Sequence, residues 1–137
     1  LLVYFMDHTI AIRSLIAIEK WDYQATILGE PASKANSRKL VRFGKRLASI
    51  KSDKARNYEK IFLAQAKAID PLIEGDVLLF CHIYYASRRP DLDESLIMDC
   101  LQDVAYKNDR QVKAKVILHG LDKDNPRAEI RLVQYPT

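Results

Sequence analysis

The stretch VLLFCHIYYASRRPDLDE, residues 77–94, decides the fold that the sequence predicts. Its first ten residues are almost continuously apolar, which is typical of a strand buried on both faces in the middle of a sheet. The apolar run ends at SRRP, residues 87–90, and acidic residues follow at once. We therefore expect residues 77–86 to form a central strand, with the charged residues lying where that strand ends.

Further elements are predicted on both sides of this strand. Ser52 is a good helix N-cap, and Asp53 follows in the first turn, where the helix dipole favours an acid. Alternating apolar residues predict strands, and Gly44 with Lys45 predicts a hairpin turn. The expected elements are strands at 22–28, 77–86, 111–118 and 127–134, a hairpin at 41–50, and helices at 52–70 and 91–101, with the last two strands closing a second hairpin. This order predicts an α+β fold, a mixed β-sheet with two main helices packed against it.

The length of 137 residues corresponds to one domain. We expect residues 21–137 to form that domain and residues 1–20 to be an N-terminal extension of uncertain order. No apolar run approaches the ~20 residues of a membrane span. Cys81 and Cys100 have no metal-ligand spacing, and we interpret them as buried thiols of a cytoplasmic protein.

The charge is divided unevenly along the chain. Residues 30–67 hold 11 Lys and Arg against 3 Asp and Glu, a net +8, whereas residues 70–109 hold 3 against 9, a net −6. The first region is typical of a surface that binds a polyanion, and the second of a site that gathers cations. Charge runs are also typical of solvated faces, so both interpretations stay open.

Acidic residues occur beside two of the predicted strands. Asp91 and Asp93 follow strand 77–86, and Asp109 precedes strand 111–118. If these strands are neighbours, the three carboxylates can converge, and a hard cation such as Mg²⁺ would relieve their repulsion. The alternative is structural: Asp91 caps a helix, Asp93 and Glu94 complement its dipole, and Asp109 begins a turn.

Four segments together resemble the RusA family of Holliday-junction resolvases. SRRPDLD at 87–93 resembles the D-L-D start of a family helix, and VAYKNDRQV at 104–112 resembles the family's D-D-x-Q-[VI] element before the next strand. GEPASKANSRK at 29–39 resembles the family's loop after the first strand, and IKSDKARNYEKIF at 50–62 its entry to a long helix. The resemblance covers about residues 24–134, in order, and implies a RusA-like fold.

The resemblance implies a homodimer that cuts four-way DNA junctions symmetrically with Mg²⁺, for which Mn²⁺ can substitute, in DNA recombination and repair. Asp91, Asp93 and Asp109 would be the metal-binding catalytic carboxylates. Two positions depart from the family pattern: Asn108 stands where the family has another Asp, and Ile97 where it has a Lys. Lys107 and Asn108 are expected only in supporting roles.

The basic region then has an expected role in holding DNA by its phosphates. The expected contacts are Lys34, Asn36, Arg38, Lys39, Arg42, Lys45, Arg46, Arg88 and Arg89. Asp99 and Asp103 are expected to face away from the acidic site or to cap the helix, with a supporting carboxylate as the lesser alternative. The family's frequent occurrence in phages makes a bacterial or phage-infected cell the expected setting.

Three hypotheses follow. The first is a Mg²⁺-dependent, structure-selective endodeoxyribonuclease that resolves branched DNA. The second is a branched-DNA-binding protein of the same fold with weakened or lost catalysis, given Ile97 and Asn108. The third is an α+β domain whose acids only cap helices. Divalent-cation binding separates the third from the others, and cleavage separates the first two.

Overall fold

The computed structural model describes residues 20–88 and 93–135. A four-stranded mixed sheet has the order β1-β6-β4-β5, and a separate two-stranded sheet contains β2 and β3. The strands are β1 (Tyr23–Leu28), β2 (Arg38–Phe43), β3 (Arg46–Lys51), β4 (Val77–Tyr85), β5 (Val112–Leu121) and β6 (Arg127–Gln134). The helices are α2 (Asp53–Gln65) and α3 (Glu94–Cys100), with short 3-10 turns η2 (Lys34–Asn36) and η3 (Asp109–Gln111). The predicted α+β fold is confirmed.

Strand β4 lies in the middle of the sheet, as the apolar run predicts. It pairs with β5 in parallel and with β6 antiparallel. Leu79, Cys81 and Ile83 are fully buried on this strand. Burying each such aliphatic side chain stabilises the fold by about 1.5–3 kcal/mol, so the central position follows from the sequence.

The hairpin predicted for the last two strands is wrong. β5 and β6 do not pair with each other, because β4 lies between them. β6 instead bridges β1 and β4, with Ala25 opposite Ile130 on one side and Cys81 opposite Ile130 on the other. Both neighbours of the most apolar strand thus come from the C-terminal part of the chain.

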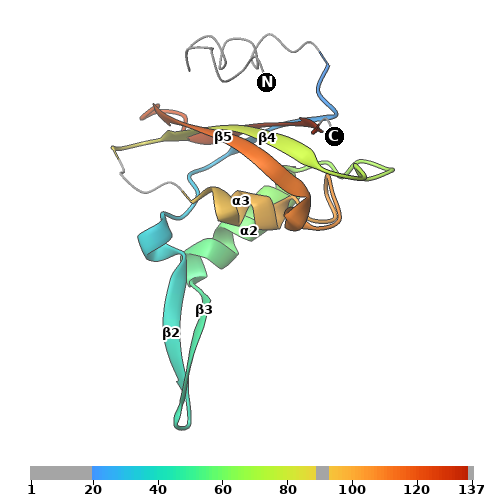
Figure 1. The fold of residues 1–137 in the computed structure, drawn as a ribbon. Helices are drawn as coiled ribbons and strands as arrows, with labels where there is room; N and C mark the ends of the chain where they lie inside the picture. Colours follow the sequence, from blue (N-terminus) through green and yellow to red (C-terminus); the bar gives the residue numbers. More distant parts are fainter. Residues whose placement is uncertain (1–19, 89–92, 136–137) are drawn as a thin grey trace, which may run out of the picture.

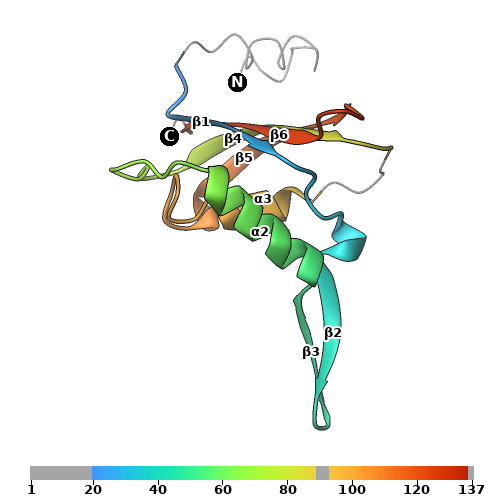
Figure 2. The ribbon, with the colours of Figure 1, turned by 180° about the vertical axis from the view of Figure 1, so that it is seen from behind.

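Helices α2 and α3 cover one face of the sheet (Figures 1 and 2). Ala55, Tyr58 and Phe62 are the buried residues of α2, and Leu96, Ile97 and Cys100 those of α3. This layer places the polar flanks of both helices beside the base of the β2–β3 hairpin. Among the described residues no helix is long and apolar enough to cross a membrane.

Both helices are shorter than predicted. α2 ends at Gln65 rather than at residue 70, because the chain turns away and Ile69 donates its backbone N–H to the Val104 carbonyl over 2.9 Å. α3 begins at Glu94 rather than at residue 91, because Asp93 is its N-cap. Residues 1–19 lie outside the described residues, so the extension predicted for residues 1–20 stays a prediction.

The β2–β3 hairpin extends away from the sheet and helices (Figure 1). Gly44 has a φ of 63° at its turn, a conformation that costs glycine little. The base of the hairpin is tied to the body, since Ser52 donates its backbone N–H to the Ser37 carbonyl over 2.9 Å. The predicted hairpin is confirmed, and its two strands run over 38–43 and 46–51.

Candidate active site

The N-terminus of α3 is built around Asp93, which is only 3% exposed. One carboxylate oxygen accepts the Leu96 backbone N–H over 3.4 Å and the Ser95 hydroxyl. The other accepts the hydroxyl of Ser37, from the basic loop before β2. Asp93 therefore caps the helix and ties that loop to it, a capping role that the structural alternative gave to Asp91. Both oxygens of Asp93 keep lone pairs.

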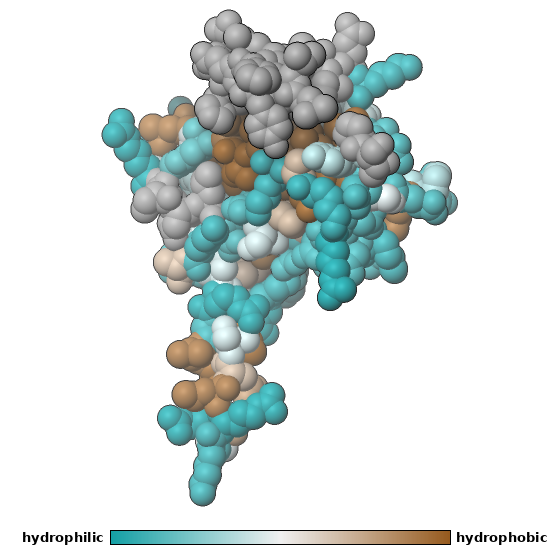
Figure 3. Space-filling view, in the orientation of Figure 1, coloured by the Kyte–Doolittle hydropathy of each residue, from teal (hydrophilic) through white to brown (hydrophobic). Residues whose placement is uncertain are grey.

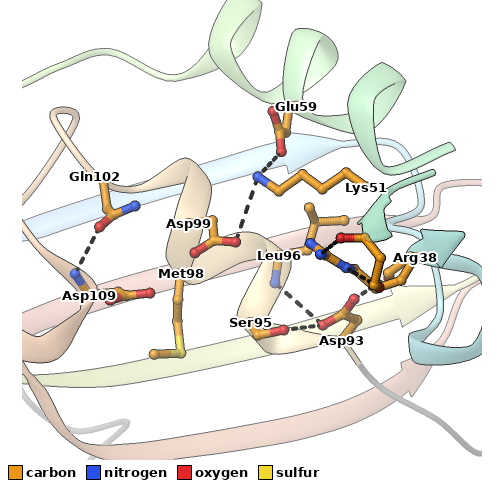
Figure 4. A network of polar contacts seen from close by, with 12 residues as sticks. Arg38, Lys51, Glu59, Asp93, Ser95, Leu96, Met98, Asp99, Gln102 and Asp109 are labelled. Carbon is orange, nitrogen blue, oxygen red and sulfur yellow. Dashed lines mark hydrogen bonds and ion pairs between the residues drawn. The ribbon is translucent and has the colours of Figure 1, made fainter. Parts of the chain in front are cut away.

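Asp99 and Asp109 are a pair of neighbouring carboxyl groups at the other end of α3 (Figure 4). Burial raises the pKa of Asp99 above its ordinary value, and the neighbouring Asp109 raises it further. The positive charge of Lys51 opposes this shift. Asp109 is held in place because its backbone N–H donates to the Gln102 side chain over 3.2 Å.

Lys51 brings an ammonium group into this cluster from the end of β3. Its Nζ lies 3.7 Å from a carboxylate oxygen of Asp99 and contacts the carboxylate of Glu59 on α2 (Figure 4). The hydrogen bond to Glu59 raises the pKa of Lys51, so the ammonium stays charged. Three elements, β3, α2 and α3, thus supply one network of charged groups.

A cleft of about 230 Å³ lies between this network and the basic loop. Its lining comes from η2, the hairpin base, α2 and the N-cap and body of α3, and it includes three cations and two acids: Lys34, Ser37, Arg38, Lys51, Ala55, Asp93, Ser95, Leu96 and Asp99. Cations on one wall and carboxylates on the other suit a phosphate together with a metal ion.

The predicted DNA contacts occupy three kinds of position. Lys34 and Arg38 line the cleft, while the Lys39 ammonium pairs with Asp53 over 3.2 Å. The Asn36 side chain donates to the Ser33 hydroxyl over 3.1 Å and so shapes the loop. The exposed cations that remain are Arg42, Lys45 and Arg46 on the hairpin and Arg88 after β4; Arg89 lies outside the described residues.

The two predicted supporting residues have structural contacts. The Lys107 ammonium pairs with Asp103 over 2.8 Å, and both side chains are largely exposed. Asn108 caps η3 by accepting the Arg110 backbone N–H over 2.9 Å, and its own N–H donates to the Gln111 side chain. Neither residue contacts the Asp99–Asp109 pair through the bonds found in the described part of the chain.

The predicted triad is only partly placed. Asp91 lies outside the described residues, and residues 20–88 and 93–135 contain no group of three His, Cys, Asp or Glu arranged to hold a metal. Asp93 and Asp109 lie at opposite ends of α3 in Figure 4, with Asp99 between them. The assignment of the triad stays a prediction.

Two residues of this network, Lys51 and Glu59, were missed by the sequence reasoning, and Asp99 was named there only as a lesser alternative. The expectation that Asp99 faces away is wrong, because Asp99 lines the same cleft as Asp93 and pairs with Lys51. Lys51 and Glu59 carried no site signal, since they lie far from the acidic motif in sequence. For Asp99 one signal exists: it lies on α3 next to the buried face, between Ile97 and Cys100, where an acid needs a partner.

The protein-family model for the RusA endodeoxyribonuclease matches residues 29–133. The chain belongs to the RusA family. It is therefore an endodeoxyribonuclease of the Holliday-junction resolvase type, a nuclease of DNA recombination that acts on branched DNA. Its fold is the RusA-like one that the motifs imply, and the family generally depends on a divalent metal. No curated protein matches the chain.

Proposed function

We propose that this RusA-family enzyme resolves four-way DNA junctions with Mg²⁺, through paired phosphodiester cuts made by a homodimer. The observation that supports it most directly is the cleft lined by cations and by the carboxyl groups of Asp93 and Asp99, with Asp109 next to Asp99. The raised pKa of Asp99 means that the negative charge of this carboxyl group is only partly compensated in the protein. A metal ion bound beside Asp99 would supply the missing positive charge.

The donor set fits Mg²⁺ because it consists of carboxylates. Mg²⁺ is usually bound by one or two carboxylates with waters and substrate phosphates completing its shell. Asp99 and Asp109 would hold it at one end of α3, whereas Asp93 and the predicted ligand Asp91 would bind metal at a separate position, where α3 begins. Bound there, the metal supplies charge neutralisation and a water of lowered pKa.

The residues of the chain have separate tasks in this proposal. Lys34 and Arg38 hold a phosphate of the DNA strand in the cleft, and Lys51 keeps a positive charge beside Asp99. Asp93 keeps the basic loop in register with α3 through Ser37. Arg88, exposed after β4, and Arg89 would hold the scissile strand from the other side.

A homodimer is proposed because symmetric cutting of a four-way junction needs two sites related by a two-fold axis. Most homo-oligomers have such an axis. We propose the cytoplasm of a bacterial or phage-infected cell as the setting, because recombining DNA is found there.

A binding-only protein of the same fold remains the second candidate, for one specific reason. Ile97, at the position of the family's Lys, is 0% exposed and belongs to the core. α3 therefore supplies no ammonium at that position. The candidate predicts tight junction binding without cuts.

The test is nicking of a labelled four-way junction with Mg²⁺, beside linear duplex. Asp99→Asn and Asp109→Asn each remove a proposed metal ligand, and Asp91→Asn and Asp93→Asn test the predicted motif. Asp103→Asn is the matched control, because Asp103 is exposed and pairs with Lys107. Paired cuts that persist in the control and disappear in the ligand variants support the proposal. Junction binding without cuts by the wild type supports the second candidate.

A further inference from the structure

The β2–β3 hairpin carries exposed apolar side chains far from the core. Leu40 is 73% exposed, and Phe43 and Leu47 are each 59% exposed. Figure 3 shows apolar side chains on this hairpin, flanked by hydrophilic ones. An isolated two-stranded hairpin is marginally stable in water, so exposed apolar residues on one are best explained by a binding partner.

The charge of the hairpin identifies the class of partner. Residues 38–51 contain six cations and no Asp or Glu: Arg38, Lys39, Arg42, Lys45, Arg46 and Lys51. Two copies of this hairpin would repel each other, whereas a polyanion is attracted. DNA is therefore favoured over a second copy of the chain.

The strand register places two of the apolar residues on one face. Leu40 lies opposite Ser49 and Arg42 lies opposite Leu47, so these four side chains share a face. Arg38 and Lys51, which are also opposite each other and line the cleft, continue the same face towards α3. The Leu40–Leu47 face of the hairpin thus runs directly into the candidate active site.

We propose that this face inserts as an apolar wedge at the branch point of a DNA junction, while the hairpin's cations hold the flanking phosphates. Apolar wedges that enter between bases are a general means of DNA distortion, and the energy they must supply is the unstacking of a base step. Base stacking is already interrupted at a branch point, so the wedge enters there more easily than in linear duplex. The wedge would give structure selectivity. The inference rests on the proposed junction-cutting function and adds the surface that recognises the branch.

The test compares the Leu40→Ala/Leu47→Ala double variant with Leu63→Ala. Leu63 is 56% exposed on α2, outside the hairpin, and serves as the matched control. Binding to a four-way junction and to linear duplex of the same sequence is measured with Ca²⁺ in place of Mg²⁺, so that no cutting is needed. A junction carrying 2-aminopurine beside the branch reports unstacking by its fluorescence.

We expect the double variant to lose about tenfold to a hundredfold in junction affinity, and its fluorescence response, while duplex affinity is unchanged. Equal losses on junction and duplex, or an unchanged junction preference, would overturn the inference. A dimer of the wild type and a monomer of the double variant in sedimentation would also overturn the inference, because the hairpin would then bind a second copy of the chain. Circular dichroism confirms that the variant is folded. A wild type without any junction preference contradicts the proposed function itself, which distinguishes the two failures.

Discussion

Replacing Asp99 with Asn is expected to stabilise the metal-free protein at neutral pH while abolishing cleavage. Burial, and then the hydrogen bond to Asp109, raise the pKa of Asp99 above its ordinary value of 3.8. The unfolded chain therefore releases this proton at a lower pH than the folded chain. The stability linked to Asp99 is complete below the unfolded pKa and is lost as the pH rises through the raised folded pKa. At neutral pH the folded protein then carries a repulsion that Asn lacks.

The expected gain is small because two effects reduce it. The Lys51 ammonium, 3.7 Å from Asp99, offsets part of the repulsion, and the Asp99 side chain is 36% exposed, so solvent screens the rest. Charge interactions at such sites contribute up to about 1 kcal/mol, and we expect about 0.5 kcal/mol. That gain raises the melting temperature by about 2 °C in a chain of this size.

The assay is thermal unfolding in EDTA at neutral pH and again below the ordinary aspartate pKa of ~3.9. Wild type and Asp99→Asn should differ at neutral pH and converge in acid, while Asp103→Asn shows no such pattern. Adding Mg²⁺ should then stabilise the wild type by about 1.4 kcal/mol at ten times the dissociation constant, and the variant by much less. A variant less stable than wild type at neutral pH, or equal stabilisation of both by Mg²⁺, would refute the carboxyl-pair reasoning.

Three further substitutions separate structural from catalytic roles. Lys51→Met should lower the cutting rate about a hundredfold and the stability by about 1 kcal/mol. The control Lys60→Met changes an exposed residue of α2 and should alter neither quantity. Equal cutting rates for the two variants would contradict the role of Lys51. Asn is also a good helix cap, so Asp93→Asn should change the free energy of unfolding, measured in urea, by less than about 1 kcal/mol, while nicking is lost. Full nicking by this variant would mean that Asp93 has only a structural role. Ile97→Lys should destabilise the protein by about 4 kcal/mol or more without raising the cutting rate, because its ammonium would be buried in the core; a faster enzyme would contradict this.

The central part of the fold could be predicted because its signals are local. The apolar run at 77–86 identifies a strand that must be covered on both faces, and it forms β4 between β5 and β6. The Gly44 turn and the Ser52 cap act within a few residues of themselves, and both are present. Such features depend on the nearest neighbours in sequence and not on the rest of the molecule.

The order of the C-terminal strands could not be predicted in this way. Alternation in residues 111–118 and 127–134 indicates two strands, and a short turn between them favours a hairpin. The pairing depends instead on which edge of β4 each strand covers. Both β5 and β6 gain more by covering β4, the most apolar strand, than by pairing with each other, and no local pattern encodes that competition.

The site shows the same division between local and tertiary information. Ile97 breaks the family pattern in α3, which by itself favours a protein that binds DNA without cutting it. The fold nevertheless brings an ammonium to Asp99 from Lys51 on β3, 48 residues earlier in the chain. An electrostatic role needs a charge at a point in space and not at a fixed place in a motif. If Lys51→Met loses cutting and Ile97→Lys gains none, the positive charge of this site has moved to another element, and the departure at residue 97 is no argument against catalysis.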